Sequence, residues 1–204
     1  KGTTKNDKIW GSNSNDILIG NEGDDTILGG QGNDEIEGGS GNDEIEGGSG
    51  NDIISSGLGR DYLKGNSGDD IFQLTADSVW SSSSEAWNIS SENTIFQKTS
   101  IAGKNKFEDV FNGSLGQDVI QLTSGSDAFF LHDAISKFND AINLTIDTYN
   151  KQNTARLILV EAIKGGEGDD LIDLTSPDIQ LSYSININGE NGNDIIWSSA
   201  GADT

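Results

Sequence analysis

The chain has 204 residues, of which 32% are hydrophobic and 27 are glycine, and this composition excludes a large apolar core. Its 34 acidic side chains outnumber 12 lysines and arginines, and the formal charge of −22 excludes nucleic acid and insertion into anionic membranes as expected partners. Cysteine is absent and His132 is the only histidine, so disulfides and thiolate or imidazole-rich metal sites are excluded. Cations that prefer oxygen ligands remain the natural partners.

A nine-residue repeat organises the first third of the chain. Residues 2–73 divide without gaps into eight nonapeptides, among them GNEGDDTIL, GGQGNDEIE and GGSGNDEIE. The eighth place of every repeat is apolar, and the residues there are Ile9, Leu18, Ile27, Ile36, Ile45, Ile54, Leu63 and Phe72. The sixth place is always aspartate, and the residues there are Asp7, Asp16, Asp25, Asp34, Asp43, Asp52, Asp61 and Asp70.

Each nonapeptide predicts a turn followed by a three-residue strand. Glycine reaches positive φ without penalty, and asparagine tolerates it better than most residues, so the Gly, Asn and Ser positions form the turn. In the strand, the eighth-place side chain faces inward and its two neighbours face outward. Successive repeats then alternate between two sheets, with one coil per 18 residues. The predicted fold is an all-β parallel β-roll over residues 1–73.

Residues 18 apart should stack one coil above another, which places the aspartates in two columns. Two unit charges ~5 Å apart repel by about 3 kcal/mol at an effective dielectric constant near 20. A divalent cation between each pair converts this repulsion into attraction. Ca²⁺ suits the position because it accepts six to eight hard oxygens in a flexible geometry, whereas Mg²⁺ requires a tight octahedron. Eight turns paired two apart give six expected calcium sites, and the cofactor prediction is about six Ca²⁺ here and a few more after residue 112.

The repeats resemble the GGxGxDxUx motif of the RTX family, secreted proteins of Gram-negative bacteria that leave the cell by type I export and fold as calcium-loaded β-rolls. The resemblance implies that the upstream turn donates the carbonyls of its second and fourth places, and the downstream turn those of its first and third places. With the aspartates, the implied backbone ligands are Thr3, Lys5, Ser12, Ser14, Gly20, Asn21, Glu22, Gly23, Gly29, Gly30, Gln31, Gly32, Gly38, Gly39, Ser40, Gly41, Gly47, Gly48, Ser49, Gly50, Ser56, Leu58, Gly65 and Ser67.

Two places in the ladder depart from the motif. Lys5 and Ser14 replace the fourth-place glycine in the first two repeats, so the first sites are expected to be weak or empty. The seventh repeat, which carries Ser56, Leu58 and Arg60, is the other irregular member.

The nine-residue register is lost after Gln73, and residues 74–112 are predicted to be an insertion. The register returns in residues 113–204 as an interrupted β-roll, with an excursion at about 131–155. Leu131, Ile135, Phe138 and Ile142 share a helical face there, whereas Leu144, Ile146 and the run 157–160 have strand character. Glu161 stands where aspartate is expected, which predicts a poor or absent metal site. The metal ligands expected after the insertion are Asp118, Asp127, Asp170, Asp194 and Asp203, and the predicted core residues are Ile120, Phe129, Ile172 and Ile196.

Residues 105–197 are similar to the interrupted β-rolls near the C-termini of giant RTX adhesins, with GSDAFFLHD and GGEGDDLIDLTSP as the most similar stretches. The resemblance implies a secreted or cell-surface module whose partners are Ca²⁺, neighbouring RTX domains or a cell-surface ligand. Because Lys1 is not methionine and the last repeat stops after Asp203, we expect the chain to be part of a longer protein.

Other functions fit the sequence less well. Zinc proteases require HExxH and lipases GxSxG, and neither motif occurs, so no catalysis is expected. The only proline, Pro177, follows Ser176, which disfavours self-cleavage at an Asp-Pro bond. The sequence has no EF-hand loop flanked by helices and no ice-binding threonine ladder. The apolar residue at every eighth place disfavours a disordered acidic segment. The surviving alternative is a recognition module that uses the insertions, suggested by the outward places of Trp10, Ile17, Ile19, Ile53, Tyr62 and Ile71.

Overall fold

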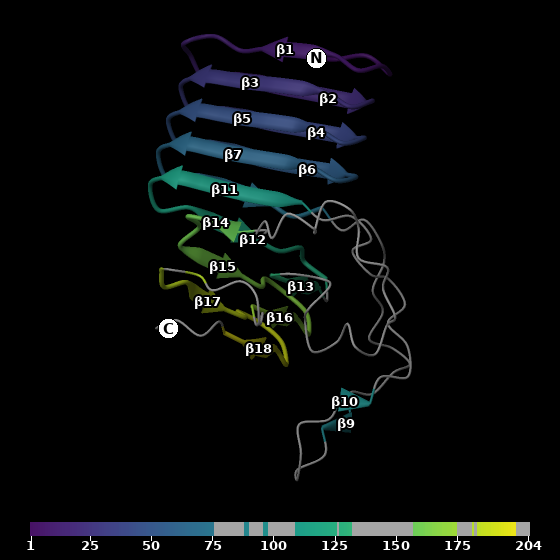
Figure 1. Cartoon of the computed structure of the whole chain (residues 1–204), viewed down its shortest axis with the longest axis vertical. Coiled ribbons are helices and arrows are strands. Elements are labelled where there is room, and N and C mark those ends of the chain that lie inside the picture. The colour runs from purple at the N-terminus through teal and green to yellow at the C-terminus, as the bar shows by residue number, and fades with distance from the viewer. Residues whose placement is uncertain are drawn as a thin grey trace.

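The computed structural model describes residues 1–75, 88–89, 96–97, 109–125, 127–131, 157–174, 181 and 183–198. Strands are the regular elements in these ranges, which contain no helix. Accordingly, the described residues include no apolar helix of membrane-spanning length. The strands stack as successive coils of a solenoid, with the N-terminus at one end of the stack (Figure 1).

The first eight strands form two parallel sheets that face each other. They are β1 (Lys8–Trp10), β2 (Ile17–Glu22), β3 (Thr26–Gln31), β4 (Glu35–Ser40), β5 (Glu44–Ser49), β6 (Ile53–Leu58), β7 (Tyr62–Ser67) and β8 (Ile71–Gln73). Odd-numbered strands pair with one another in one sheet and even-numbered strands in the other. Because Ile27 pairs with Ile45 and Ile36 with Ile54, the register repeats every 18 residues. The predicted parallel β-roll is confirmed.

Strands β2 to β7 are six residues long, twice the predicted length. The additional residues belong to the turn, where Gly30 pairs with Gly48 and Gln31 with Ser49. The amide of Gly32 also donates a hydrogen bond of 2.8 Å to the carbonyl of Ser49. Turn residues of successive coils therefore bond to each other as the strands do, because identical turns stack in register.

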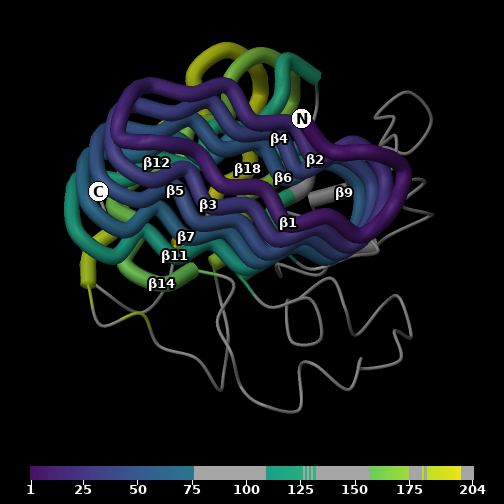
Figure 2. The backbone as a smooth tube through the Cα atoms, turned by 90° about the horizontal axis from the view of Figure 1, so that it is seen from above, coloured from purple at the N-terminus to yellow at the C-terminus, as the bar shows by residue number. Residues whose placement is uncertain are grey.

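The eighth-place side chains form a thin core between the two sheets. Those of Ile27, Ile36, Ile45, Ile54, Leu63 and Phe72 are fully buried, whereas Ile9 in the first strand is half-buried. The seventh- and ninth-place residues alternate with them and are exposed or half-buried, as the strand pattern predicts. Viewed along the stack, the coils superpose as a flattened ring (Figure 2).

The two sheets continue beyond residue 108 and a third sheet joins them. The later strands are β11 (Val110–Leu115), β12 (Val119–Gln121), β13 (Ala128–Phe130), β14 (Leu157–Ile158), β15 (Ala162–Lys164), β16 (Leu171–Asp173), β17 (Asn186–Asn188) and β18 (Ile195–Trp197). Strands β13, β16 and β18 form the third sheet, which the sequence did not predict. The short strands β9 (Asn88–Ile89) and β10 (Phe96–Gln97) pair antiparallel.

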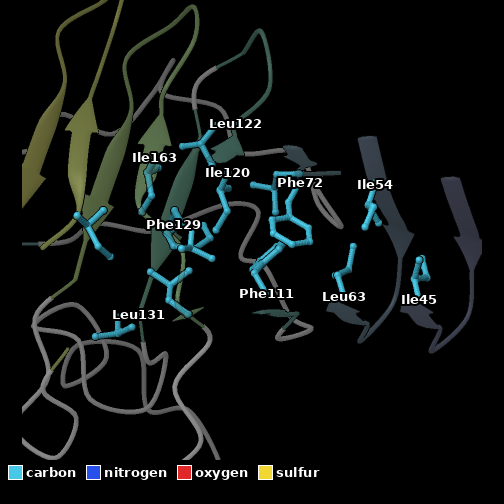
Figure 3. Close-up of a cluster of buried hydrophobic side chains, with 14 of the residues drawn as sticks. Ile45, Ile54, Leu63, Phe72, Phe111, Ile120, Leu122, Phe129, Leu131 and Ile163 are labelled. Carbon is cyan, nitrogen blue, oxygen red and sulfur yellow. The ribbon is translucent and has the colours of Figure 1, made fainter. Parts of the chain in front are cut away.

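The roll resumes before Gly113, inside the segment predicted as insertion. Val110 pairs with Tyr62 and Phe111 with Leu63, so β11 stacks directly on β7. The ring of Phe111 lies 5.7 Å from that of Phe72 and 6.2 Å from that of Phe129, measured between centroids. The hydrophobic core consequently runs without a break from the first part of the roll into the second (Figure 3).

Three further predictions concern the second half. Of the run 157–160, Leu157 and Ile158 form a strand, and Leu131, the first residue of the predicted helical face, is buried and not helical. Ile196, a predicted core residue, is 39% exposed because β18 is the edge strand of its sheet. The helical face and the strand predicted between residues 132 and 156 lie outside the described residues.

Candidate metal-binding turns

Two backbone positions adopt a left-handed conformation in the regular turns from the third repeat onward. Positive φ occurs at the fourth place, as in Gly32 (φ 110°) and Gly50 (φ 121°), and at the second place, as in Gly39 (φ 117°) and Asn66 (φ 78°). A Cβ atom on Gly39 would collide with the carbonyl oxygen of Asn21 in the coil above. At Gly39, glycine therefore serves both the conformation and the close approach of successive turns, which brings backbone oxygens together.

The sixth-place aspartates stack in columns through one of their two carboxylate oxygens. The amide of Asp25 donates to Oδ1 of Asp43, one coil further on, over 2.8 Å. Equivalent bonds of 2.7–3.0 Å link the first column in the order Asp7, Asp25, Asp43, Asp61 and Asp109. The second column runs Asp16, Asp34, Asp52, Asp70, Asp118 and Glu161. A third column, in the third sheet, joins Asp127, Asp170 and Asp194.

The second oxygen, Oδ2, is buried without a hydrogen-bond partner in most inner turns. In the described part of the chain this holds for Asp25, Asp34, Asp43, Asp52, Asp70, Asp118 and Asp170, all at most 2% exposed. A buried carboxylate oxygen with no donor is strongly destabilising unless a cation or a proton reaches it. The Oδ2 atoms thus fit Ca²⁺, which needs anionic oxygen ligands.

Burial raises the pKa values of several buried aspartates in the columns. Desolvation raises the pKa of Asp43 and of Asp52 to about 6, with further contributions from the carboxylates of Asp25 and Asp34 respectively. The pKa of Asp70 rises to about 7, first through desolvation and then through its neighbours Asp118 and Asp52. Desolvation likewise raises the pKa of Asp118 and of Asp170 to about 6. Each column therefore resists holding its full negative charge unless a cation compensates it.

The first aspartate of each column is bonded differently. Oδ2 of Asp7 accepts hydrogen bonds from the amide and the hydroxyl of Thr3, at 2.6 and 2.7 Å. Ser12 does the same for Asp16 and Thr123 for Asp127. The bonds from Thr3 lower the pKa of Asp7. In the first turn of each column, which has no turn above it, a Ser or Thr at the second place therefore donates hydrogen bonds to the aspartate carboxylate.

These bonds give a physical reason for the expected weakness of the first two sites. Lys5 and Ser14 are not among the positive-φ residues, so the first two turns differ in conformation from the others. The seventh repeat, in contrast, retains positive φ at Gly57 and Gly59 and buries Ser56 completely. Its turn has the same shape as its neighbours despite its unusual sequence. Calcium occupancy of these three turns stays a prediction.

The expected backbone ligands lie at the interfaces between coils. The third-place carbonyls of Ser40, Ser49, Leu58 and Ser67 each accept a 2.8 Å hydrogen bond from the fourth-place amide of the coil above. A carbonyl oxygen has two lone pairs, so each retains one acceptor position. No three His, Cys, Asp or Glu side chains converge on one point in the described ranges. Any ion there must therefore combine two carboxylates with backbone oxygens.

A second ladder of side chains was missed from the sequence. The fifth-place Asn33 accepts a 2.9 Å hydrogen bond at Oδ1 from the amide of Asn51 in the next coil, and Asn15 accepts one from Asn33. Asp24 and Asp69 serve in the same way. These asparagines lie in the turns, as expected, but they do not have positive φ. The recurrence of Asn or Asp at the fifth place every 18 residues is the sequence signal that could have predicted this ladder.

Asp109 was also missed. It is fully buried and receives the amide of Asp61 at its Oδ1, in the ligand place of the first column. Its signal in the sequence is the segment KNKFEDVFN, which has Asp109 nine residues before Asp118 and Phe111 nine before Ile120. This segment was not recognised as a repeat because it has no glycine. Asp203, the last expected ligand, lies outside the described residues.

The outward apolar residues differ in exposure. Trp10 is 64% exposed and Ile17 70%, whereas Ile53 and Ile71 are each 38% exposed and are paired neighbours in the even-numbered sheet. Ile19 and Tyr62 are half-buried. Most of residues 74–112, the predicted insertion, fall outside the described ranges. The recognition alternative that rests on these side chains stays a prediction.

Comparison with known families finds four copies of the RTX calcium-binding nonapeptide repeat, at residues 1–36, 28–63, 37–72 and 186–204. Neither the curated proteins nor the solved structures yield a match to the chain. The matched ranges contain the first eight turns and the turn of Asp194, while the turns of Asp118, Asp127 and Asp170 lie outside them.

Proposed function

Because the chain belongs to the RTX calcium-binding repeat family through residues 1–72 and 186–204, we propose that it is a structural module whose stacked turns each hold Ca²⁺ between two coils. The RTX repeats make it a calcium-binding chain, and they are not a catalytic family. The proposal adds the ligands and the number of ions: two aspartates and backbone carbonyls at each of six positions in residues 2–73.

The buried, unpartnered Oδ2 atoms are the observation that supports this assignment. At least one aspartate in each pair contributes an oxygen that no donor in the described chain satisfies. A backbone carbonyl lies nearby, because Oδ2 of Asp34 and the carbonyl oxygen of Gly47 both approach Gly29. Bound calcium would supply the positive charge that lets these carboxylates stack. Since ions bind only the folded turns, calcium would add to the stability of the roll by mass action.

The proposed coupling between calcium binding and folding also favours a secreted location. Within this proposal the chain stays largely unfolded where calcium is scarce, passes through a type I exporter of a Gram-negative bacterium, and folds outside the cell. Its charge of −22 would oppose compaction until calcium is available. Its role would be that of a folding and spacing module of a larger adhesin or related exoprotein.

The experiment compares the chain in EDTA, in millimolar Ca²⁺ and in millimolar Mg²⁺ by circular dichroism and size-exclusion chromatography. Calcium should restore β-structure and compactness, and magnesium should do so poorly. A double variant, Asp34→Asn with Asp43→Asn, keeps the oxygens that accept the amides of Asp16 and Asp25. It removes a charged ligand from four of the six positions, so it should bind fewer ions with less cooperative folding.

The matched control is Glu35→Gln with Glu44→Gln, which makes the same charge change at the exposed neighbouring places. It should bind as many ions as the unchanged chain. Equal calcium stoichiometry in the Asp34/Asp43 double variant and in this control would reject the assigned columns. A chain that is equally β-structured in EDTA and in calcium would reject the function itself.

A further inference from the structure

We propose that Asp70 and Asp118 share a calcium ion, which fastens the two parts of the roll together across residues 76–108. This inference rests on the proposed function, because it extends calcium binding to a pair of turns outside the regular repeat spacing. The two aspartates are 48 residues apart, whereas neighbours in the regular columns are 18 apart. The family repeats match only as far as residue 72 on this side of the chain.

The hydrogen bonds at this junction are those of the regular columns. The amide of Asp70 donates to Oδ1 of Asp118 over 2.9 Å, as the amide of Asp52 donates to Oδ1 of Asp70 over 2.9 Å. Both aspartates are completely buried, and neither Oδ2 atom has a hydrogen-bond partner. Two anionic oxygens in adjacent turns thus lack a compensating charge, and this is the same requirement that calcium meets in the regular repeats.

The two turns also have the backbone shape of the repeat. Asn66 (φ 78°) and Gly68 (φ 128°) have positive φ in the upper turn, and Ser114 (φ 74°) and Gly116 (φ 152°) in the lower turn. A Cβ atom on Gly116 would collide with the carbonyl oxygen of Gly68, so the two turns approach each other as closely as regular neighbours do. Backbone oxygens of the two turns would complete the oxygen ligands of an ion that the two carboxylates bind.

The strands beside the turns fix this arrangement. Ile71 pairs with Val119 and Phe72 with Ile120 in the sheet that follows the aspartates. The amide of Gly68 donates a 3.0 Å hydrogen bond to the carbonyl of Leu115 on the other side of the turn. Asp70 and Asp118 therefore lie in successive turns that are joined by backbone hydrogen bonds on both sides.

The experiment counts calcium ions per chain by equilibrium dialysis in the full chain and in four variants. Asp118→Asn and Asp70→Asn each retain an acceptor oxygen but lose the negative charge. Asp69→Asn is the control, because Asp69 lies in the same turn and its exposed side chain accepts the amide of Gln117, a bond that asparagine can also accept. The fourth variant combines Asp70→Asn with Asp118→Asn.

We expect Asp69→Asn to bind as many ions as the unchanged chain and Asp118→Asn to bind at least one fewer. The double variant should lose one ion fewer than the sum of the two single losses, because both residues are ligands of the same ion. Strictly additive losses, or an unchanged count in Asp118→Asn, would overturn the shared site. If the unchanged chain and the Asp69 variant bind no calcium, the proposed function fails instead.

Discussion

Each inner aspartate uses its two oxygens for different purposes. Oδ1 of Asp52 accepts the amide of Asp34, which fixes the position of the carboxyl group, and its Oδ2 is buried with no donor. A neutral asparagine could accept the amide equally well. The requirement for aspartate at the sixth place therefore comes from the second oxygen, which needs a cation, and not from the bond that joins the coils.

The raised pKa values predict an unusual pH dependence in metal-free solution. The pKa is about 6 for Asp43 and about 7 for Asp70 in the folded chain, against 3.8 for an unperturbed carboxyl group. Between pH 3.8 and these raised pKa values, the folded chain binds more protons than the unfolded chain. The stability that these protonated carboxyl groups contribute is therefore fully present below about pH 4 and is lost as the pH rises through 6 to 7. In metal-free buffer we expect more β-structure by circular dichroism at pH 5 than at pH 8.

Saturating calcium should reverse this trend, because protons compete with calcium for the same oxygens. The pH at the midpoint of the metal-free loss of β-structure shows whether buried or exposed carboxyl groups cause it. Burial places it between pH 6 and 7, whereas a glutamate side chain in a model peptide titrates at about pH 4.3. A metal-free chain with more β-structure at pH 8 than at pH 5 would contradict the burial of these groups.

At the level of the turn, coils are joined by bonds that do not involve calcium. The fifth-place ladder links Asn15, Asn33, Asn51, Asp69 and Gln117 through successive side chain to amide bonds of 2.9–3.0 Å. Both Asn and Asp serve as acceptors, which explains why the two residues interchange at this place. The ladder lies beside the aspartate columns and holds the turns in register, so that the carboxylates face each other.

The variants Asn33→Ala and Asn33→Asp test this ladder. Alanine removes the acceptor of the Asn51 amide, so the free energy of unfolding in saturating calcium should fall by about 0.5–1.5 kcal/mol, the net value of one hydrogen bond. Aspartate retains the acceptor and should cost less, as Asp24 does at the same place. Urea unfolding followed by circular dichroism measures both. Equal losses for the two variants would show that the hydrogen bond to Asn51 does not contribute.

Over the whole molecule, the sequence predicted what repeats and missed what does not. The nine-residue period was sufficient to identify the paired sheets, the Ile27 to Phe72 core and the aspartate columns of residues 2–73. Asp109 was missed because the residues before it lack the glycines of the repeat, although Asp109 itself accepts the amide of Asp61 as a regular column member does. The third sheet was missed because its aspartates are 43 and 24 residues apart, and spacings that vary give no periodic signal. Such long-range pairings depend on the folded chain.

The continuous core predicts that the parts of the roll on either side of residues 76–108 unfold together. Phe111 is fully buried between Phe72 and Phe129, one on each side, so Phe111→Ala should destabilise the calcium-loaded chain by about 3–5 kcal/mol. In a solenoid, neighbouring coils stabilise each other, so amide hydrogen exchange should accelerate in both β8 and β12. Leu115 lies in the same strand but is 70% exposed, so the control Leu115→Ala should change neither the free energy of unfolding nor the hydrogen exchange. Faster exchange in β12 alone would mean that the two parts fold independently, despite the contact between their aromatic rings.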